Sequence, residues 1–515
     1  MLALLSVFLV ALFTQSAYAV SFAKIYGVAD EDYAYSVQQT SDGGYILAGL
    51  TSSFGAGSDD IFLIKTDANG NIIWAKTYGG TSGDWASSVQ QTSDGGYILA
   101  GSTYTFGAGN YDAFLIKTDA NGNVQWAKTY GGTDDDYAFS VQQTSDGGYI
   151  VVGGTSSFGA GWGNIFLIKT DANGNVQWAK TYGGTSGYGA YSVQQTSDGG
   201  YILTGWTLSF GAGLADIILI KTDANGNVQW AKTYGEANWD YGYSVQQTSD
   251  GGYIVAGGTD SFGAGNWDIW LIKTDANGNL QWAKTYGGTG YDLAYSVQQT
   301  SDGEYIVAGI TASFGAGLGD VFLVKMDANG NIIWAKTYGG TNTDLAYSVQ
   351  QTSDGEYIVA GITWSFGADL YEAFLIKTDA DGDMGSCSIA QDASPTVNTV
   401  SPTVNTPTPS ISYPSFTVNS PSPTVTSPTL TVSEPCPFLS ISESCQIASG
   451  LITPYKGGIK VSGSGEFEVK VYNVSGGIVK SIKGKDEVKL ELSRGVYFVE
   501  VITNSRVLRE KVIIR

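Results

Sequence analysis

The 515-residue sequence predicts an all-β chain whose main part is a seven-bladed β-propeller, a closed ring of seven small sheets. The first observation is a repeat, Tyr-Ser-Val-Gln-Gln-Thr-Ser-Asp-Gly-Gly-Tyr-Ile, which begins at Tyr35 and recurs with small changes every 52 residues. The second is the four-strand pattern inside each repeat, and the third is a last repeat that lacks one strand. The Asp of Ser-Asp-Gly marks the seven copies: Asp42, Asp94, Asp146, Asp198, Asp250, Asp302 and Asp354.

Each repeat carries four short apolar runs separated by turn residues, without helical periodicity. In the second repeat, Asp94-Gly95-Gly96 and Asp119-Ala120-Asn121-Gly122-Asn123 are typical of hairpin turns. Runs that are apolar on both faces need cover on both sides, so each unit must pack between neighbours. The expected strands of this repeat lie at 88–93, 97–101, 113–118 and 124–130.

The ends of the array predict how the ring closes. The seventh repeat stops at Met384 without its fourth strand, which in other copies reads Trp-Ala-Lys-Thr-Tyr-Gly. A matching stretch, Phe22-Ala23-Lys24-Ile25-Tyr26-Gly27, stands at the other end of the chain. We therefore expect the N-terminal strand to complete the last blade, which leaves few open strand edges.

The repeat resembles the Ser-Asp-Gly-Gly-Tyr propeller repeats of secreted prokaryotic surface proteins. This resemblance covers about residues 20–385 and implies the propeller fold rather than a particular activity. The apolar run at 1–19 ends in Ala17-Tyr18-Ala19 and predicts a secretory signal peptide. A membrane anchor is the alternative, but the run is short and polar at Thr14-Gln15-Ser16, so no membrane span is expected after cleavage.

Residues 386–437 form a Pro/Thr/Ser-rich linker that predicts an extended stalk, either O-glycosylated or an unmodified spacer. Cys436 and Cys445 are candidates for a disulfide, and a bond from Cys387 to Cys436 is the alternative. Because these are the chain's three cysteines, the propeller itself has no catalytic thiol.

The last region, 438–515, has the pattern of a small β-sandwich. The expected strands are 467–472, 478–482, 487–492, 495–502 and 507–514. Three motifs stand out: Val471-Tyr472-Asn473-Val474-Ser475-Gly476-Gly477, Leu492-Ser493-Arg494-Gly495-Val496-Tyr497-Phe498-Val499 and Lys511-Val512-Ile513-Ile514. They resemble the C-terminal sorting domain of type IX secretion substrates, which implies export to the cell surface and contact with secretion machinery. An ordinary immunoglobulin-like module is the alternative.

Charge and composition exclude several functions. The chain carries a net charge of −22, and fourteen lysines are the only basic residues of the repeats, so nucleic acid is not an expected partner. The chain has no histidine, which excludes Ser–His and Cys–His catalysis. No cofactor is required by any motif.

Comparison of the seven copies with each other predicts a ligand-binding face. With strands named a to d from the axis outward, the d–a and b–c loops vary most and share one face. These loops are rich in aromatic and acidic residues, which suits stacking on sugars and hydrogen bonding to hydroxyls; unconstrained loop drift is the alternative. The candidate ligand-binding residues are Trp85, Tyr104, Tyr111, Tyr137, Trp162, Tyr188, Trp206, Trp239, Trp267, Tyr291, Trp364 and Tyr371.

Two repeat positions on the same face are acidic in almost every copy, and we call each set of equivalent residues an acidic column. Such a carboxylate either accepts backbone N–H bonds that fix a loop or binds Ca²⁺. The first column, the candidate metal ligands, is Asp32, Asp84, Asp136, Asp240, Asp292 and Asp344, with Tyr188 as the exception. The second is Asp60, Asp112, Asp216, Asp268, Asp320 and Glu372, with Asn164 as the exception.

Two other repeated features indicate structural roles. The tryptophans of the fourth strands, such as Trp74, predict packing between blades, and the Gln38-Gln39 pair and its equivalents predict the lining of the central channel. Together these features predict a non-enzymatic binding or adhesion protein, secreted or at the cell surface, whose partner is an extracellular glycan or a surface protein. The alternatives are a structural surface-layer protein and a carbohydrate-active enzyme that uses paired carboxylates.

Overall fold

The computed structural model describes residues 21–27, 30–367, 370–385, 389–401, 403–405, 410–412, 417–419, 424–426, 431–433, 452–455, 458–472, 478–491, 495–503 and 507–514. The predicted signal peptide and all three cysteines lie outside these residues. The chain divides into two compact units, Met1–Cys436 and Pro437–Arg515, which are described separately.

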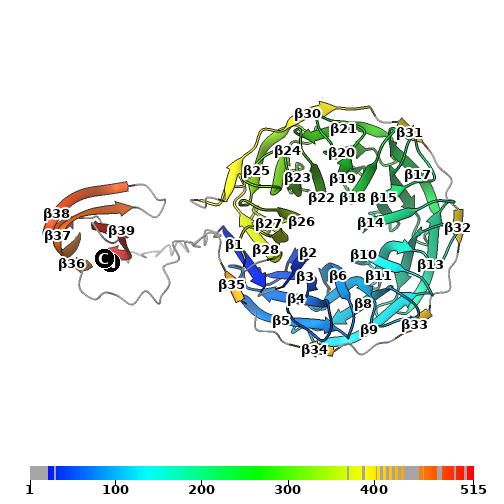
Figure 1. Cartoon of the computed structure of the whole chain (residues 1–515), viewed down its shortest axis with the longest axis horizontal. Coiled ribbons are helices and arrows are strands. Elements are labelled where there is room, and N and C mark those ends of the chain that lie inside the picture. The colour runs from blue at the N-terminus through cyan, green and yellow to red at the C-terminus, as the bar shows by residue number, and fades with distance from the viewer. Residues whose placement is uncertain are drawn as a thin grey trace, which may run out of the picture. The chain divides into compact units, whose positions relative to one another are not determined.

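The first unit is a ring of seven antiparallel sheets around an open axis, which confirms the predicted seven-bladed propeller (Figure 1). Strand a lies at the axis and strands b, c and d follow outward. The seven a strands are β2 (Asp32–Gln39), β6 (Asp84–Gln91), β10 (Asp136–Gln143), β14 (Tyr188–Gln195), β18 (Asp240–Gln247), β22 (Asp292–Gln299) and β26 (Asp344–Gln351). The b strands are β3 (Tyr45–Thr51), β7 (Tyr97–Thr103), β11 (Tyr149–Thr155), β15 (Tyr201–Thr207), β19 (Tyr253–Thr259), β23 (Tyr305–Thr311) and β27 (Tyr357–Thr363).

The c and d strands complete the repeat pattern. The c strands are buried along their whole length, except at Lys325 of β24, because each lies between two strands of its own blade and between two neighbouring blades. They are β4 (Asp60–Thr66), β8 (Asp112–Thr118), β12 (Asn164–Thr170), β16 (Asp216–Thr222), β20 (Asp268–Thr274), β24 (Asp320–Met326) and β28 (Glu372–Thr378). The d strands are β5 (Ile72–Gly79), β9 (Val124–Gly131), β13 (Val176–Gly183), β17 (Val228–Gly235), β21 (Leu280–Gly287), β25 (Ile332–Tyr338) and, in the last blade, β1 (Phe22–Gly27).

The N-terminal strand closes the ring as predicted. β1 pairs antiparallel with β28, with Phe22 opposite Lys377 and Tyr26 opposite Ala373. The ring therefore joins the two ends of the repeat array by backbone hydrogen bonds, and the last blade contains strands from both ends.

The Pro/Thr/Ser-rich linker adds a fifth strand to every blade, so the expectation of a free stalk is wrong for these segments. After β28 the chain turns back and passes blades six, five, four, three, two, one and seven in that order, pairing antiparallel with each outermost strand (Figure 1). We call these seven segments the belt. They are β29 (Ala390–Asp392), β30 (Thr396–Thr399), β31 (Thr403–Asn405), β32 (Ser410–Ser412), β33 (Thr417–Asn419), β34 (Thr424–Thr426) and β35 (Thr431–Ser433).

The belt has a seven-residue period that matches one segment to each blade. A Thr-Val or Ser-Ile pair recurs at this spacing, and the apolar residue lies opposite the tyrosine near the end of the d strand. The register pairs are Ala390 with Tyr338, Val397 with Tyr286, Val404 with Tyr234, Ile411 with Tyr182, Val418 with Tyr130, Val425 with Tyr78 and Val432 with Tyr26. Strand pairing satisfies backbone groups that an outermost strand would otherwise expose.

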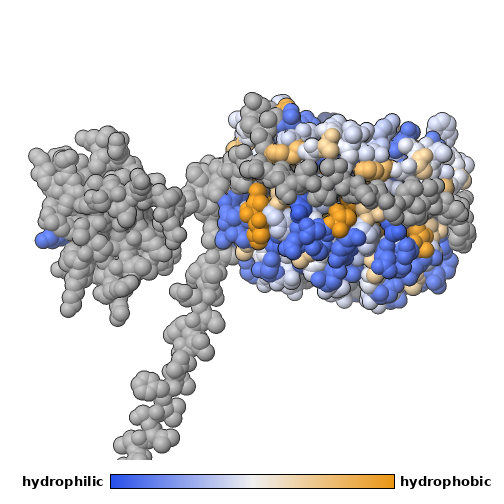
Figure 2. Space-filling view, turned by 90° about the horizontal axis from the view of Figure 1, so that it is seen from below, coloured by the Kyte–Doolittle hydropathy of each residue, from blue (hydrophilic) through white to orange (hydrophobic). Residues whose placement is uncertain are grey.

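The tyrosines of the d strands also join neighbouring blades. Tyr78 is fully buried, and its hydroxyl donates a hydrogen bond to the backbone oxygen of Gly122 in the next blade at 2.7 Å. Trp74 packs edge-on against Tyr97 with ring centroids 5.9 Å apart, which supports the predicted inter-blade packing. On the side of the ring that Figure 2 shows, the described rim carries hydrophilic side chains with separate small hydrophobic patches between them.

The second unit is a sheet of five antiparallel strands: β36 (Ile452–Tyr455), β37 (Gly458–Tyr472), β38 (Ile478–Glu491), β39 (Gly495–Thr503) and β40 (Val507–Ile514). The two strands predicted at 478–482 and 487–492 are one strand. Gly484 and its charged neighbours suggest a turn, but β37 runs alongside and places Phe467 opposite Gly484. The packing of a sandwich stays a prediction. Within the described parts of the chain, no helix is long and apolar enough to cross a membrane.

Candidate functional site

The variable loops share one face of the ring because the strand ends that carry them lie together. Asp84 at the start of an a strand pairs with Thr103 at the end of the b strand, and Thr103 pairs in turn with Asp112 at the start of the c strand. The d–a and b–c loops therefore open on the same side in each blade. We call this side the loop face.

The structure places the predicted aromatic residues on the loop face with different exposures. Four of them are well exposed: Trp162 at 87%, Tyr104 at 50%, Tyr291 at 41% and Trp364 at 40%. Tyr188 is only 3% exposed and packs against Phe210, so it is not available to a ligand and this prediction is wrong. In its blade, Tyr188 stands at the position that is an aspartate of the first acidic column in the other blades, and its ring occupies that buried space. The half-buried remainder are Trp85, Tyr111, Tyr137, Trp206, Trp239, Trp267 and Tyr371.

Four of the predicted residues form a first aromatic cluster across two neighbouring blades. Tyr111 lies at its centre, with ring centroids 4.9 Å from Trp85, 5.0 Å from Tyr104 and 5.4 Å from Tyr137. Each ring is held by its neighbours, so the exposed faces have fixed positions. The cluster is thus a preformed aromatic surface.

A second cluster is built around Tyr241, which the sequence analysis did not select. Its ring stacks on Trp267 at 5.5 Å with planes 6° apart, and Trp239 and Trp206 lie 6.0 Å from it. Burial raises the pKa of Tyr241 to about 12, so its hydroxyl stays protonated and neutral over the physiological range. Tyr291 extends the cluster through Trp267, at 6.2 Å.

A third cluster joins the last blade to the first. Tyr371 lies 5.6 Å from Trp364 and 5.7 Å from Tyr33. Tyr33 in turn stacks on Tyr35 at 5.8 Å, which connects this cluster to the axis.

An arc of six aromatic rings surrounds the axis on the loop-face side and links the three clusters. Neighbouring rings contact each other from blade to blade, with Tyr35 and Tyr347 4.9 Å apart, and Ser87 occupies the seventh position. The sequence analysis missed this arc because it compared copies where they differ. A nearly constant aromatic residue at one repeat position was the available signal. The arc consists of Tyr35, Phe139, Tyr191, Tyr243, Tyr295 and Tyr347.

The first acidic column fixes the d–a loops to the b–c loops. Asp84 is 1% exposed, and its Oδ2 accepts hydrogen bonds from the backbone N–H of Gly80 at 2.9 Å and from Oγ1 of Thr105 at 2.8 Å. Asp136 repeats this arrangement with Gly132 and Ser157, both at 2.8 Å. The column therefore performs the loop-fixing role that was one of its two interpretations.

The second acidic column fixes the b–c loops themselves and lies close to the first. Oδ2 of Asp112 accepts the backbone N–H groups of Ala108 at 3.0 Å and Gly109 at 3.3 Å. The point where a Cβ of Gly131 would stand is 1.8 Å from Asp112 Oδ1 and 2.9 Å from Asp136 Oδ2, so only glycine fits there. Two buried carboxyl groups thus lie on either side of this glycine.

Burial controls the protonation of the second column. It raises the pKa of Asp112 to about 6, and the nearby Asp136 adds to the shift. The pKa values of Asp216 and Asp320 are raised to about 6 in the same way. Ca²⁺ takes about six to eight oxygen ligands, and the described residues contain no cluster of three or more acidic or cysteine side chains arranged for a metal ion. A role for Ca²⁺ stays a prediction.

These shifts predict that the propeller is most stable on the acid side of neutrality. Because folding raises the pKa of Asp112, Asp216 and Asp320, the stability they contribute is complete below the ordinary carboxyl pKa near 4 and is lost as the pH rises through about 6. Thermal unfolding of the full chain should therefore occur several degrees higher at pH 5 than at pH 7.5. The triple variant with Asn at these positions should lose part of that difference, because burial also raises the pKa of other carboxyl groups in the two columns, such as Asp60 and Asp268.

Other carboxylates set the acid limit of the pH range in which the propeller is most stable. Burial alone would raise the pKa of Asp94, but hydrogen bonds from Thr92 and Lys117 outweigh it and lower the pKa to about 2. A lowered pKa gives stability that is present above the ordinary value and lost as the pH falls toward 2. A melting temperature that rises steadily from pH 5 to pH 8 would contradict this account.

Comparison with known proteins gives a family match that lies inside the second unit. Residues 453–515 match the family described as secretion system C-terminal sorting domain. Regulatory protein FlaEY of Caulobacter vibrioides is 25% identical over 344 residues, which cover 61% of this chain and 33% of that protein; the chain thus spans a third of that relative's length. A crystal structure titled as the eukaryotic initiation factor is similar with a TM-score of 0.32 and 9% identity, covering 69% of this chain and 98% of that one.

The sorting family and the ring together establish the type of protein. The family match lies in the second unit, where the resemblance to type IX sorting domains was noted, and the first unit is the closed propeller. The chain is a secreted or cell-surface seven-bladed β-propeller protein whose residues 453–515 match the secretion system C-terminal sorting domain family.

Proposed function

We propose that the propeller is a non-enzymatic binding module that recognises an extracellular glycan through its loop face. The observation that carries the proposal is the set of three preformed aromatic clusters around one mouth of the axis. Aromatic residues that remain exposed in an ordered polar surrounding are typical of binding sites. A protein of the cell surface is the alternative ligand, and the test below separates the two.

The side chains beside the clusters suit a carbohydrate. Asn110 and Asp134 are exposed next to the first cluster, and Asn238 and Asn266 are exposed next to the second. Their oxygens and amide groups can accept and donate hydrogen bonds to hydroxyls, while the aromatic planes contact the apolar face of a sugar ring. Several similar clusters on one ring also favour multivalent attachment to a repeating polymer.

The paired carboxylates support binding rather than hydrolysis. A glycosidase needs two accessible carboxyl groups at a defined separation, one on each side of the scissile bond. Asp112 and Asp136 are both 0% exposed and are engaged by backbone N–H groups of their loops. The same arrangement recurs in other blades, which is the pattern of a structural element.

The test is an array of glycans and cell-wall polysaccharides probed with the full mature chain. We expect saturable binding that becomes roughly tenfold weaker or more when Tyr104, Trp162 and Trp364 are all replaced by Ala, because each removes an exposed stacking surface. Ile73→Ala is the matched control, since Ile73 is 56% exposed but lies on β5, away from the loop face.

The outcomes separate the two ligand classes. A blank array together with capture of an envelope protein that the triple variant fails to capture would assign a protein ligand. Equal binding by the triple variant and the Ile73→Ala control would contradict the proposed face. Turnover of any arrayed glycan would contradict the non-enzymatic assignment.

A further inference from the structure

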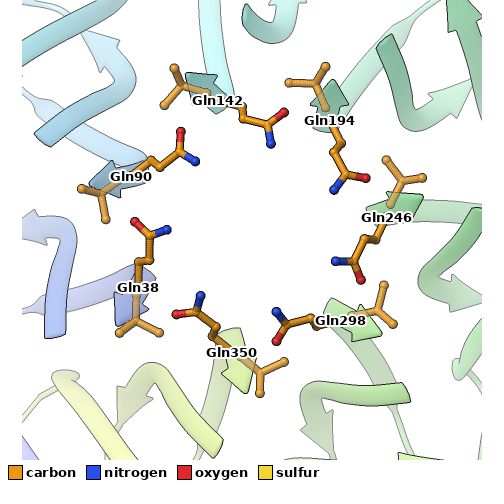
Figure 3. Close-up of a pocket in the computed structure, with 14 residues that line it drawn as sticks. Gln38, Gln90, Gln142, Gln194, Gln246, Gln298 and Gln350 are labelled. Atoms are coloured by element: carbon orange, nitrogen blue, oxygen red, sulfur yellow. The ribbon is translucent and has the colours of Figure 1, made fainter. Parts of the chain in front are cut away.

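The channel along the axis narrows to a cavity of about 250 Å³ lined by two rings of side chains. One ring consists of valines and the other of glutamines, one of each from every a strand, which confirms the predicted channel position of the first Gln of each pair (Figure 3). The valines are Val37, Val89, Val141, Val193, Val245, Val297 and Val349, and the glutamines are Gln38, Gln90, Gln142, Gln194, Gln246, Gln298 and Gln350.

Each glutamine amide in the ring is held in one orientation. Oε1 of Gln90 accepts the backbone N–H of Gln143 in the next blade at 2.6 Å, and Oε1 of Gln246 accepts that of Gln299 at 2.5 Å. The same bond closes the ring, from the backbone of Gln39 to Gln350 at 2.6 Å. Because a backbone N–H can only donate, the oxygen must face it and the NH₂ group is left on the other side.

The NH₂ groups converge on the axis. Figure 3 shows the seven nitrogens directed into the channel from all sides. Among the residues that the structure describes, none supplies a hydrogen-bond acceptor to Nε2 of these seven glutamines. The cavity therefore presents a ring of N–H donors, and the oxygen of each amide is turned toward a backbone N–H of the next blade.

No negatively charged side chain in the cavity lining offsets the partial positive charge of these N–H donors. The cavity lining contains no charged residue. In five blades the aspartate of the a–b turn pairs with a lysine of its own blade, as Asp94 does with Lys117 at 2.9 Å. In the other two blades, Lys325 and Lys377 each pair with two carboxylates, which lie in the turns and not in the cavity lining. Converging N–H dipoles without a nearby carboxylate attract negative charge, and hydrogen bonds to an ionised acceptor are the stronger kind.

We propose that the glutamine ring binds a small inorganic anion, a halide or an oxyanion such as sulfate. A cation would face seven partial positive charges. A neutral hydroxyl group would satisfy the amide donors, but the amide oxygens, its available acceptors in the ring, are turned toward the neighbouring backbone N–H groups. An anion needs donors only, which is what this ring provides.

The test uses the full mature chain with bromide and with sulfate as probes. Calorimetric titration at constant ionic strength is expected to give saturable binding at one site per chain, and competition between the two anions distinguishes a halide site from an oxyanion site. Crystals grown in bromide are expected to show an anomalous peak on the axis at the level of the glutamine ring.

The sharpest variant is Gln90→Glu/Gln246→Glu. Glutamate has the same shape and still accepts the backbone N–H of Gln143 or Gln299, but it replaces each channel NH₂ with a negative oxygen. Binding of both anions should fall by roughly tenfold or more. A matched control is Gln125→Glu/Gln229→Glu, two exposed residues on the d strands β9 and β17 that add the same charge outside the channel.

Two results would overturn the proposal. One is a wild-type chain that binds neither anion saturably and gives no bromine peak on the axis, a result that does not depend on whether any variant folds. The other is a folded Gln90→Glu/Gln246→Glu protein that binds both anions as well as the control does.

Discussion

A chain that ends at Gly385, before the belt, is expected to unfold at a temperature roughly 5–10 °C lower than one that ends at Cys436, and to aggregate. Each belt segment forms antiparallel backbone pairs with one outermost strand, as Val404 does with Tyr234. A net contribution of about 0.5–1.5 kcal/mol for each hydrogen bond, summed over seven blades, supports an effect of this size. Calorimetry and light scattering measure the two effects.

Aggregation follows from the geometry of the ring without its belt. Removal of the belt exposes the edges of β5, β9, β13, β17, β21, β25 and β1, and exposed strand edges pair with other chains. Deletion of one seven-residue unit, residues 402–408, provides an internal comparison. It should leave one blade without its fifth strand and cause a smaller loss than the full truncation. Identical melting curves for the chains ending at 385 and 436 would show that the belt does not stabilise the ring.

A chain that lacks residues 437–515 is expected to fold but not to reach the cell surface. The sorting family match covers 453–515, within the second compact unit, and the ring with its belt lies wholly in the first. The change should therefore abolish export rather than folding. Cell fractionation and labelling of intact cells with an antibody to the propeller measure the location.

The control for export is the loop-face variant with Ala at Tyr104, Trp162 and Trp364. It should appear at the surface in the same amount as the wild type, because these residues lie in the first unit, outside the residues that match the sorting family. Surface labelling of the chain truncated at 436 at the wild-type level would contradict the role of the second unit.

The ring could be predicted from the sequence because the same strand and turn pattern occurs in all seven repeats. A unit of constant length, two glycine-containing hairpin turns and a missing strand supplied by Phe22–Gly27 leave little freedom in topology. Each blade also reproduces the same buried c strand, so seven copies give seven independent observations of one pattern. The second unit has one copy of each strand, and there the predicted break inside β38 was wrong.

The belt could not be predicted from composition because its strands depend on partners. Segments of three residues between prolines, such as Thr403–Asn405, have no strand pattern of their own and pair only because the ring offers seven regularly spaced edges. The available signal was numerical: a seven-residue period in Thr-Val pairs, repeated once for each blade. Composition alone led instead to the expectation of a stalk.

The candidate site was predicted in part. Variation among the copies selected Tyr104, Trp162 and Trp364, and the structure shows that these three rings are exposed, since residues free of packing constraints are free to vary. Their role in binding stays a prediction. It also selected Tyr188, which varies because it replaces a buried aspartate. The near-constant Tyr35 and its equivalents were overlooked, because constancy in a repeat indicates packing and recognition equally.

The most direct test of recognition by the loop face is hydrogen–deuterium exchange of the full mature chain with and without the glycan that binds best on the array. The account predicts slower exchange in the d–a and b–c loops, such as 104–111 and 236–239, and no change in the a–b turns at the opposite side, such as 93–96. Slower exchange in the a–b turns, with the loop face unaffected, would contradict it.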